Sequence, residues 1–346
     1  MTPDPVSFCI AQDMVAIRAD KKKIDPLYLF AVLRSAQVQF SIENMHVGTL
    51  IPHFKKGDFD KLKLPVPDRG AQEYIGNLYY DFCNKIELNQ RMNETLEGMA
   101  RSIFKSWFVD FDPVHAKAEG RNPEGMDSAT AALFPSTFTD NGLPEGWEEK
   151  TLERIALLNP ESWGKSNHPN NVEYVDLANT KWGVIECTQQ YIWNDAPSRA
   201  RRVLQNEDTI VGTVRPGNGS YSYIGDSGLT GSTGFAVLRP KKSEYAEAVF
   251  CTATSKDNID RLAHLADGGA YPAVRPDVVI DTPFIFAGDE ILSAFAENVK
   301  PLIEKIESNK KQNQTLAALR DTLLPKLISG ELSVDTATEK LKEAVG

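Results

Sequence analysis

Two segments of the chain show the apolar periodicity of long amphipathic helices. One begins at Gln72 and the other at Asp289, and each continues for roughly 36 residues, or about 55 Å of helix. Within each segment, apolar positions alternate between spacings of four and three residues, which is the pattern of a coiled-coil seam. The pattern therefore predicts two long helices that each present one apolar stripe to a partner.

The two segments are copies of one unit. A shift of 220 positions places Asn89 on Asn309 without a gap, and upstream it places Gly48 on Gly268. Repeats of solenoid proteins are far shorter than this period. The sequence therefore indicates a duplication, in which two matched helices act as a spacer between other domains.

Both copies place two asparagines in the middle of the seam. A buried asparagine lowers stability but fixes register, because a misaligned pairing leaves its amide without a partner. We expect the helices to pair antiparallel within one chain, with the asparagines meeting near the middle; the alternative is that each helix lies on its own domain. The expected seam residues are Ile75, Phe82, Ile86, Asn89, Asn93, Leu96, Leu302, Ile306, Asn309, Asn313 and Leu316.

The remaining segments predict an α+β protein. Short strand-like pieces separated by Gly, Asn and Pro predict a β-rich domain with some helix over residues 142–286; the pieces are VEYVDL, GVIECTQQYI, DTIVGTV, SYSYIG and TGFAVLRP. Near the N-terminus we expect a strand over 14–19, an amphipathic helix from Pro26 and a strand over 61–67. These elements resemble the end of the β-rich domain, so the first copy lacks about its first half.

The expected organisation follows from these segments. A remnant of a first β-rich domain (1–66) precedes the first spacer helix (67–110), for which Asp68 is the expected N-cap. A connector (111–141) rich in Pro, Gly, Asn and Asp, with one short helix, leads to the complete β-rich domain (142–286). The second spacer helix (287–330) and a polar tail (331–346) complete the chain.

Composition narrows the class of protein. The net charge of −10 and a pI of about 5.2 argue against gripping nucleic acid by bulk electrostatics, although a local basic face can still bind DNA. The four cysteines form no CxxC motif, and no apolar run approaches the roughly 20 residues of a membrane span. We expect a cytoplasmic protein with reduced thiols.

Catalytic and metal-binding motifs are not found. The sequence has no GxxxxGK[ST] phosphate loop and no GxSxG elbow, and its histidines lack metal-ligand spacing. Asn159-Pro160-Glu161-Ser162 only faintly resembles an amino-methyltransferase motif, and no glycine-rich cofactor loop accompanies it. We expect no catalytic residue, no metal site and no cofactor bound by this chain.

The β-rich domain instead offers polar, basic and aromatic residues on predicted loops. Arg and Lys can read guanine edges, Asn can read adenine, and hydroxyl or basic groups can hold phosphates. Each residue has an alternative role as a solvated charge or as part of the core. The candidate DNA contacts are Asn179, Lys181, Trp182, Ser198, Arg199, Arg201, Arg202, Arg215, Asn218, Ser220, Tyr221, Tyr223 and Arg275.

Several phrases resemble the specificity subunits of type I restriction-modification systems. They are RSIFKSWFVDFDPVHAK from Arg101, GLPEGWEEKTLERIA from Gly142, STGFAVLRP from Ser232 and LLPKLISGELSV from Leu323. In that family, GLPEGW opens a target-recognition domain, and KSWFVDFDPV and LLPKLISGEL close the two spacer helices. The resemblance covers nearly the whole chain, and the phrases occur in the family's order.

The resemblance implies a function. Each target-recognition domain of the family reads one half of a split double-stranded DNA sequence, and the paired helices set the gap between the halves. The helices also dock methyltransferase subunits, which bind S-adenosylmethionine, and motor-nuclease subunits, which use ATP and Mg, join them. The resemblance places the docking surface on the spacer helices and on the FKSWFVDFDP segment, which begins at Phe104.

The chain departs from the family in one respect, because it has one complete recognition domain and a remnant. Three interpretations follow: a truncated, inactive subunit; a half-subunit that forms a self-dimer and reads a symmetric target; or a subunit completed by a second polypeptide. A non-catalytic coiled-coil scaffold is the rival from another class. A free-standing nuclease or methyltransferase would need a motif that the sequence lacks.

Overall fold

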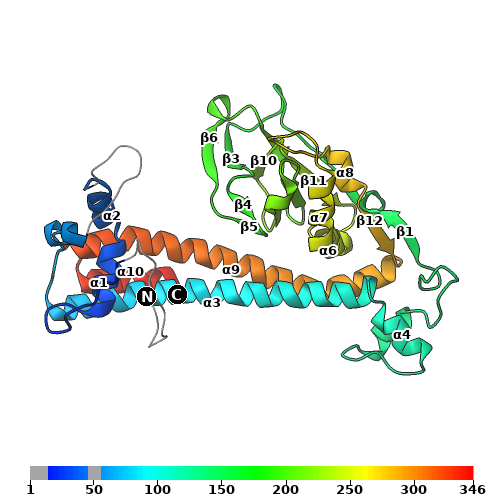
Figure 1. The fold of residues 1–346 in the computed structure, drawn as a ribbon, viewed down its shortest axis with the longest axis horizontal. Helices are drawn as coiled ribbons and strands as arrows, with labels where there is room; N and C mark the ends of the chain where they lie inside the picture. The colour runs from blue at the N-terminus through cyan, green and yellow to red at the C-terminus, as the bar shows by residue number, and fades with distance from the viewer. Residues whose placement is uncertain (1–14, 46–55, 346) are drawn as a thin grey trace. The chain divides into compact units, whose positions relative to one another are not determined.

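The computed structural model describes residues 15–45 and 56–345 (Figure 1). The chain forms two compact units, of which the first comprises residues 1–92 and 308–346 and the second residues 93–307. Two long helices, α3 (Arg69–Phe108) and α9 (Asp289–Ser329), contribute residues to both units. Among the described residues, none of the helices combines the length and the apolar character that crossing a membrane requires.

The two long helices begin where the sequence predicts. The Asp68 side chain accepts the Ala71 N–H at 3.0 Å, so the expected N-cap of α3 is confirmed. Helix α9 begins at Asp289, and Glu290 follows in its first turn, where carboxylates interact favourably with the helix dipole.

In the first unit the helices pair antiparallel. Ile75 and Tyr79, from the start of α3, share one core with Leu323 and Leu327, from the end of α9. Further along α3, Asn89 is 1% exposed, and its amide nitrogen donates to Asn313 Oδ1 at 2.9 Å and to Gln312 Oε1 at 2.7 Å. The seam asparagines therefore meet across the pair in this unit.

This pairing predicts an efficient cross-link. Cysteines at positions 89 and 313 should be joined in the folded protein by a short cross-linker with two thiol-reactive ends. The asparagine side chains that they replace are in hydrogen-bond contact. Gel mobility and mass spectrometry of the trypsin-digested chain would measure the yield. A control pair at Glu87 and Asn313 should react poorly, because Glu87 is exposed on α3. Equal yields from both pairs would contradict this register.

In the second unit the opposite ends of the same helices pair. The Phe295 ring, from the start of α9, lies 5.9, 5.8 and 5.2 Å from the rings of Phe104, Trp107 and Phe108 at the end of α3. The antiparallel spacer is therefore confirmed in both units. The alternative, in which each helix lies only on its own domain, is wrong.

The N-terminal elements differ from the sequence prediction. The helix expected from Pro26 is two helices, α1 (Pro26–Arg34) and α2 (Ala36–Glu43), because Ser35 is extended and its hydroxyl donates to the Val32 carbonyl. Residues 15–20 and 62–68 contain no strand, so both expected strands are wrong over their described parts. In the second of these segments, Pro65 and Pro67 lack the N–H groups that a strand ladder needs.

The duplication is visible in the order of these small helices. The second unit contains α6 (Ala246–Ala253), α7 (Lys256–Leu265) and α8 (Pro276–Ile280). A shift of 220 residues places them at 26–33, 36–45 and 56–60, which match α1, α2 and the 3₁₀ helix η1 (Lys56–Lys61). The first unit thus repeats the helical end of the second.

The β-rich domain of the second unit is built on two four-stranded sheets. Their strand orders are β6-β3-β10-β7 and β2-β11-β8-β9, and only the pairing of β3 with β10 is parallel. A β4-β5 hairpin and an antiparallel β1-β12 pair complete it. The bounds are β1 Glu148–Thr151, β2 Ala156–Leu158, β3 Asn171–Val175, β4 Thr180–Lys181, β5 Val184–Ile185, β6 Gln189–Ile192, β7 Ala200–Val203, β8 Thr209–Gly212, β9 Tyr221–Tyr223, β10 Leu229–Ser232, β11 Phe235–Pro240 and β12 Pro283–Phe286.

Helices cover this domain on the side of the second sheet. Helix α6 is buried along its whole length and packs against β8 and β11, whose residues Ile210, Val211, Ala236 and Leu238 are almost fully buried. Figure 1 shows α6 and α7 beside these strands. The mixed architecture confirms the predicted α+β class.

The connector and the tail are more ordered than expected. The connector forms α4 (Asp112–Ala118) and α5 (Ser128–Leu133), which is one helix more than predicted. The polar tail is a helix, α10 (Val334–Val345), in which Ala337 is fully buried in the core of the first unit. Ala337 packs in this core and the Thr338 hydroxyl donates to the Tyr74 hydroxyl at 2.9 Å, so these two small residues help to hold a helix whose sequence looks like a solvated tail.

Candidate DNA interface

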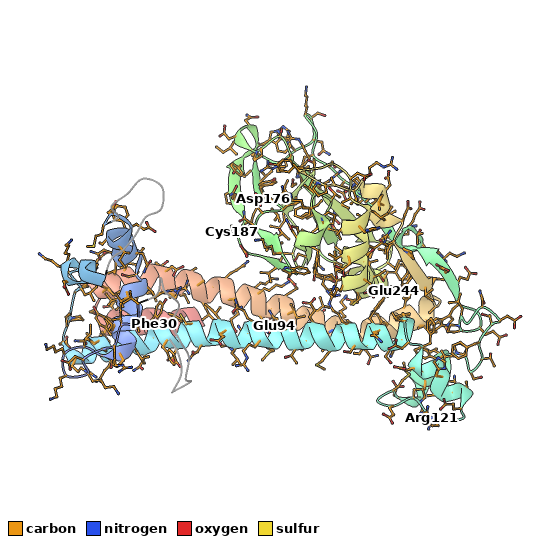
Figure 2. The ribbon with its side chains drawn as sticks, viewed as in Figure 1. Phe30, Glu94, Arg121, Asp176, Cys187 and Glu244 are labelled. Carbon is orange, nitrogen blue, oxygen red and sulfur yellow. The ribbon has the colours of Figure 1, made fainter. Side chains whose placement is uncertain are left out.

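The β4-β5 hairpin begins at a local turn set by Asp176. Its carboxylate accepts the Asn179 N–H at 2.9 Å, and its carbonyl accepts the Thr180 hydroxyl at 2.8 Å. Asp176 precedes the hairpin and Cys187 follows it (Figure 2). Asn179 is half-buried and helps to shape the turn, whereas Lys181 is exposed.

Trp182 forms the tip of this hairpin and is held in place by its backbone. It has a left-handed φ of 47°, and its N–H donates to the Gly219 carbonyl at 2.7 Å. A Cβ at Gly219 would lie 2.6 Å from the Trp182 ring, so only glycine fits beneath the indole. The ring nevertheless remains 56% exposed. An aromatic surface is thus presented to solvent on a rigid support.

The neighbouring loop adds a cation and a second aromatic ring. Arg215 precedes the 3₁₀ turn η4 (Pro216–Asn218), and its guanidinium donates to the Ala270 carbonyl at 2.7 Å and lies 4.7 Å from the Tyr271 ring centre. Asn218 is exposed, and its N–H donates to the Arg215 carbonyl at 2.9 Å.

These neighbouring groups form one exposed surface, which we call the Trp182 surface. Tyr271 is 71% exposed, and sequence reasoning missed it, although its Gly-Gly-Ala-Tyr-Pro context signals an exposed loop. The predicted Arg275 is exposed a few residues further along the same segment, at the N-cap of α8. The Trp182 surface consists of Lys181, Trp182, Arg215, Asn218 and Tyr271.

Three of the candidate DNA contacts lie in the interior, so their prediction as exposed loop residues is wrong. Ser220, Tyr221 and Tyr223 are 7%, 5% and 7% exposed. The Ser220 hydroxyl donates to the Leu177 carbonyl, and the Tyr223 ring packs 5.7 Å from that of Phe250. Burial raises the pKa of Tyr221 above its ordinary value. These side chains support the Trp182 surface from below and cannot touch DNA from where they lie.

A second group of candidate residues surrounds Trp193, in which His168 is exposed and Trp193 and Arg201 are half-buried. The His168 ring stacks on the Trp193 indole at 4.4 Å with an angle of 5°, and the Arg201 guanidinium lies 4.3 Å from the same ring. Arg201 is the predicted member of this group, whereas His168 and Trp193 were missed. Their positions in two separate loops gave no sequence signal that they would meet.

The basic residues near Arg201 do not form one loop patch. Arg201 and Arg202 lie in strand β7, so the predicted loop is wrong there, and adjacent strand residues point to opposite faces. Arg202 donates to Ser162 Oγ at 3.2 Å, and burial lowers its pKa. Arg199 donates to the Tyr174 hydroxyl at 2.9 Å, and Ser198 is exposed beside it.

The expected seam residues are buried to different depths. Those almost fully buried are Ile75, Phe82, Asn89, Ile306 and Asn309. Those half-buried are Ile86, Asn93, Leu96, Leu302, Asn313 and Leu316.

The aromatic residues of the FKSWFVDFDP segment pack in or against the core of the second unit. Trp107 and Phe108 are 6% and 3% exposed, while Lys105 and Val109 face solvent. The Trp107 and Phe108 side chains are thus mostly enclosed, whereas Phe104 and Phe111 are half-buried. Within the described parts of the chain, no group of His, Cys, Asp or Glu side chains could hold a metal ion.

The sequence of this chain is similar to the sequences of known proteins. Residues 1–98 match the family described as type I restriction modification DNA specificity domain. The specificity subunit of the type I restriction enzyme HindI from Haemophilus influenzae is 24% identical, over 94% of this chain and 82% of that protein. The MjaIX specificity subunit from Methanocaldococcus jannaschii is 26% identical, over 89% of this chain and 69% of that protein.

A solved structure is also similar. The type I restriction-modification S subunit from M. genitalium matches with a TM-score of 0.49 and 18% identity, over 89% of this chain and 74% of that one. The sequence relatives share one description, and they align along nearly the whole chain. Residues 1–98 thus match the type I restriction modification DNA specificity domain, and most of the chain is similar to type I restriction enzyme specificity subunits.

Proposed function

We propose that this chain is the DNA-recognition subunit of a type I restriction-modification complex. Its β-rich domain binds one half of a bipartite double-stranded target, and its paired helices dock methyltransferase subunits and, through them, motor-nuclease subunits. S-adenosylmethionine, ATP and Mg then belong to those partners, and this chain supplies no catalytic group. The observation that carries the proposal is the Trp182 surface, which presents cations, an amide and aromatic rings on a rigid support.

The chemistry of this surface suits a DNA groove. Lys181 and Arg215 can contact phosphates or guanine, and Asn218 can donate to and accept from adenine. The side chains are exposed, whereas the backbone beneath them is fixed by hydrogen bonds and by the close contact of Trp182 with Gly219. Such preorganisation reduces the entropy lost on binding.

Charge reversal on this surface should weaken DNA binding. We expect Lys181→Glu with Arg215→Glu to reduce affinity by about 10–100-fold at low salt and to lower the salt slope by about two. Fluorescence anisotropy with a labelled duplex, in the presence of the methyltransferase partner, would measure both. The matched control reverses Arg121 and Lys150, which are exposed on the connector and on β1 (Figure 2). Equal loss in both variants would contradict a local interface.

Genome-wide mapping of methylated adenines would test the whole proposal. The chain would be expressed with its methyltransferase partner in a host without DNA methylation. A split palindromic motif would indicate a self-dimer with one reader in each copy, and an asymmetric split motif would indicate a second polypeptide. Absence of methylation, with the two proteins bound to each other, would show a docking subunit or scaffold that reads no DNA.

A further inference from the structure

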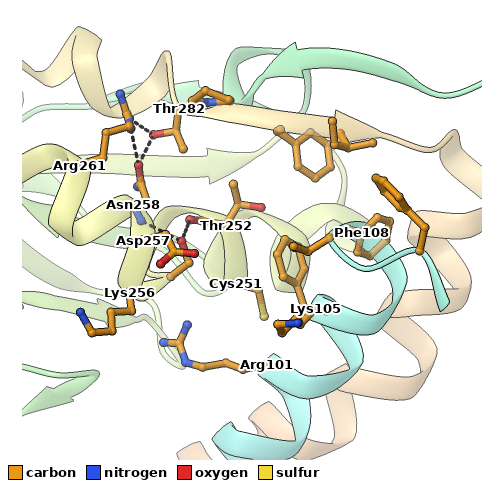
Figure 3. Close-up of a pocket in the computed structure, with 17 residues that line it drawn as sticks. Arg101, Lys105, Phe108, Cys251, Thr252, Lys256, Asp257, Asn258, Arg261 and Thr282 are labelled. Carbon is orange, nitrogen blue, oxygen red and sulfur yellow. Dashed lines mark hydrogen bonds between the residues drawn. The ribbon is translucent and has the colours of Figure 1, made fainter. Parts of the chain in front are cut away.

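A cavity of about 580 Å³ opens in the second unit, and none of the Trp182 surface residues lines it (Figure 3). It lies between the end of α3, the corner between α6 and α7, and strand β12. Pockets that bind ligands in proteins have volumes of this size. Nothing in the proposed reading of DNA uses it.

The walls of the cavity are largely apolar. Phe104, Phe108 and Phe111 line it from the side of α3, and Phe284 and Ile285 line it from β12. A further aromatic side chain would gain from packing against such a wall, because both apolar surfaces would leave water. The cavity therefore favours an apolar group.

The polar groups on the opposite wall are occupied with each other. Asn258 Oδ1 accepts from Arg261 Nε at 2.9 Å and from the Thr282 hydroxyl at 3.2 Å, and Arg261 also donates to Thr282 at 2.8 Å (Figure 3). They have little capacity left to orient a small polar ligand. The exception is the Thr252 hydroxyl, which is buried without a hydrogen-bond partner among the described residues.

The rim of the cavity is cationic. Its charged lining residues are Arg101, Lys105, Lys256 and Arg261, against the single acid Asp257. Such a cluster is notable in a chain whose net charge is −10. Charge complementarity therefore favours an anionic occupant.

Two of these cations can exchange their present partners at little cost. Lys105 pairs with Asp110, and Lys256 pairs with Asp260, but the two lysine side chains are 63% and 83% exposed. Exposed ion pairs add little to stability, because solvent and salt screen the two charges. Arg261 donates hydrogen bonds to neutral acceptors, which are the Asn258 side chain, the Val278 carbonyl and the Thr282 hydroxyl.

The duplication shows that the fold does not require these cations. A shift of 220 residues places Asp321, Pro325, Ala36 and Ser41 at the positions that the four cations occupy in the second unit. The first unit keeps the helices without the charges. The cationic rim is therefore a property of this copy alone.

We propose that this cavity binds a peptide segment of a partner protein, in which one aromatic side chain is flanked by acidic residues. The aromatic ring fills the apolar cavity, and the carboxylates pair with Lys105 and Lys256 at its rim. A polypeptide fits better than a free metabolite, because the polar wall is already satisfied and Val109, 55% exposed, extends the apolar surface outward. This inference does not depend on DNA recognition.

Three fluorescein-labelled peptides test this proposal by anisotropy with the full chain. The first has one phenylalanine between acidic residues, the second has alanine in its place, and the third has phenylalanine between lysines. We expect the first to bind at least tenfold more tightly than the other two. Lys105→Glu with Lys256→Glu should weaken that binding at least tenfold, whereas a control with Lys21→Glu and Lys22→Glu, which are exposed in the first unit, should not.

The outcomes separate the alternatives. Equal binding of the phenylalanine and alanine peptides would overturn the proposed aromatic anchor. Equal affinity of the first peptide for the variant at Lys105 and Lys256 and for the control variant at Lys21 and Lys22 would overturn the proposed binding site. Binding of anilinonaphthalene sulfonate that no peptide displaces would also overturn the proposal and indicate a small organic anion instead. Circular dichroism melts of each variant would establish that the fold is intact, and DNA binding, measured separately, should be unchanged.

Discussion

Replacing Phe295 with alanine should lower the free energy of unfolding of the second unit by about 3–5 kcal/mol. Phe295 is fully buried, and its ring meets those of Phe104, Trp107 and Phe108 at 5.9, 5.8 and 5.2 Å. The Phe295 ring packs edge-to-face against the rings of Phe104 and Trp107. This geometry adds about 0.5–1.5 kcal/mol for each pair beyond the burial of apolar area. The truncation would leave a cavity at the point where the two spacer helices pair.

Urea denaturation followed by tryptophan fluorescence would measure this loss, because Trp107 reports on the same cluster. Met99→Ala provides the control, since Met99 lies on α3 but is 49% exposed. The control should change stability by no more than about 0.5 kcal/mol. A loss below about 1 kcal/mol for Phe295→Ala would show that the aromatic cluster does not hold the helices together.

The long helices were predictable because their signal is local and repeated. Alternating spacings of four and three over many turns define a helix and its buried face, and the second copy confirms each position. The paired asparagines also give the register, which the bond between Asn89 and Asn313 realises. The same periodicity cannot tell which aromatic residues face a partner chain, so the FKSWFVDFDP segment, which begins at Phe104, suggested a surface although Trp107 and Phe108 lie in the core.

The β-rich domain was predictable only in part, because its strands depend on distant partners. Each of the five apolar pieces contains a strand, but EEKT (β1) and ARRV (β7) were missed. Their charged residues have low strand propensity, and pairing with β12 and β10 determines their conformation. The break at Ser35 was missed for a related reason, since its side-chain bond to Val32 competes with helix continuation.

The residues of the candidate DNA interface were also predictable only in part. Trp182 and Arg215 were found because turn residues surround them, whereas Tyr221 and Tyr223 were misplaced in a short strand that is buried on both faces. His168 and Tyr271 were missed, because their ring contacts join segments that are far apart in sequence. Residue type thus identifies candidate loops, but only tertiary contacts separate exposed readers from their supports.

The second large effect concerns a buried carboxylate where the β-rich domain meets α9 within the second unit. Glu247, on α6, is fully buried, and neither carboxylate oxygen has a hydrogen-bond partner among the described residues. Burial raises its pKa to about 7, and the nearby acids Glu207 and Glu304 act in the same direction, against the opposing charge of Lys300. Glu247 therefore holds a proton in the folded protein at pH values where the unfolded chain has lost it.

The sign of the pH dependence follows from this difference. The ordinary pKa of a glutamate is about 4.5 and the folded value is about 7, so the folded state binds more protons between these values. Stability should therefore fall as pH rises from about 4.5 to about 7 and then level off. At about 1.4 kcal/mol for each pKa unit, the loss attributable to this group is about 3 kcal/mol at pH 8.

Glu247→Gln should remove this loss, because glutamine has nearly the same shape and no charge to bury. At pH 8 the free energy of unfolding of the variant, measured by urea denaturation, should exceed that of the parent by about 2–3 kcal/mol. At pH 4.5 the two free energies should nearly coincide. Glu244→Gln is the matched control, because the Glu244 side chain near α6 (Figure 2) is 40% exposed and lies 3.8 Å from Lys242. Parallel stability profiles for the parent and Glu247→Gln between pH 5 and 8 would mean that Glu247 is ionised in the folded chain, and that Lys300 or water reaches it.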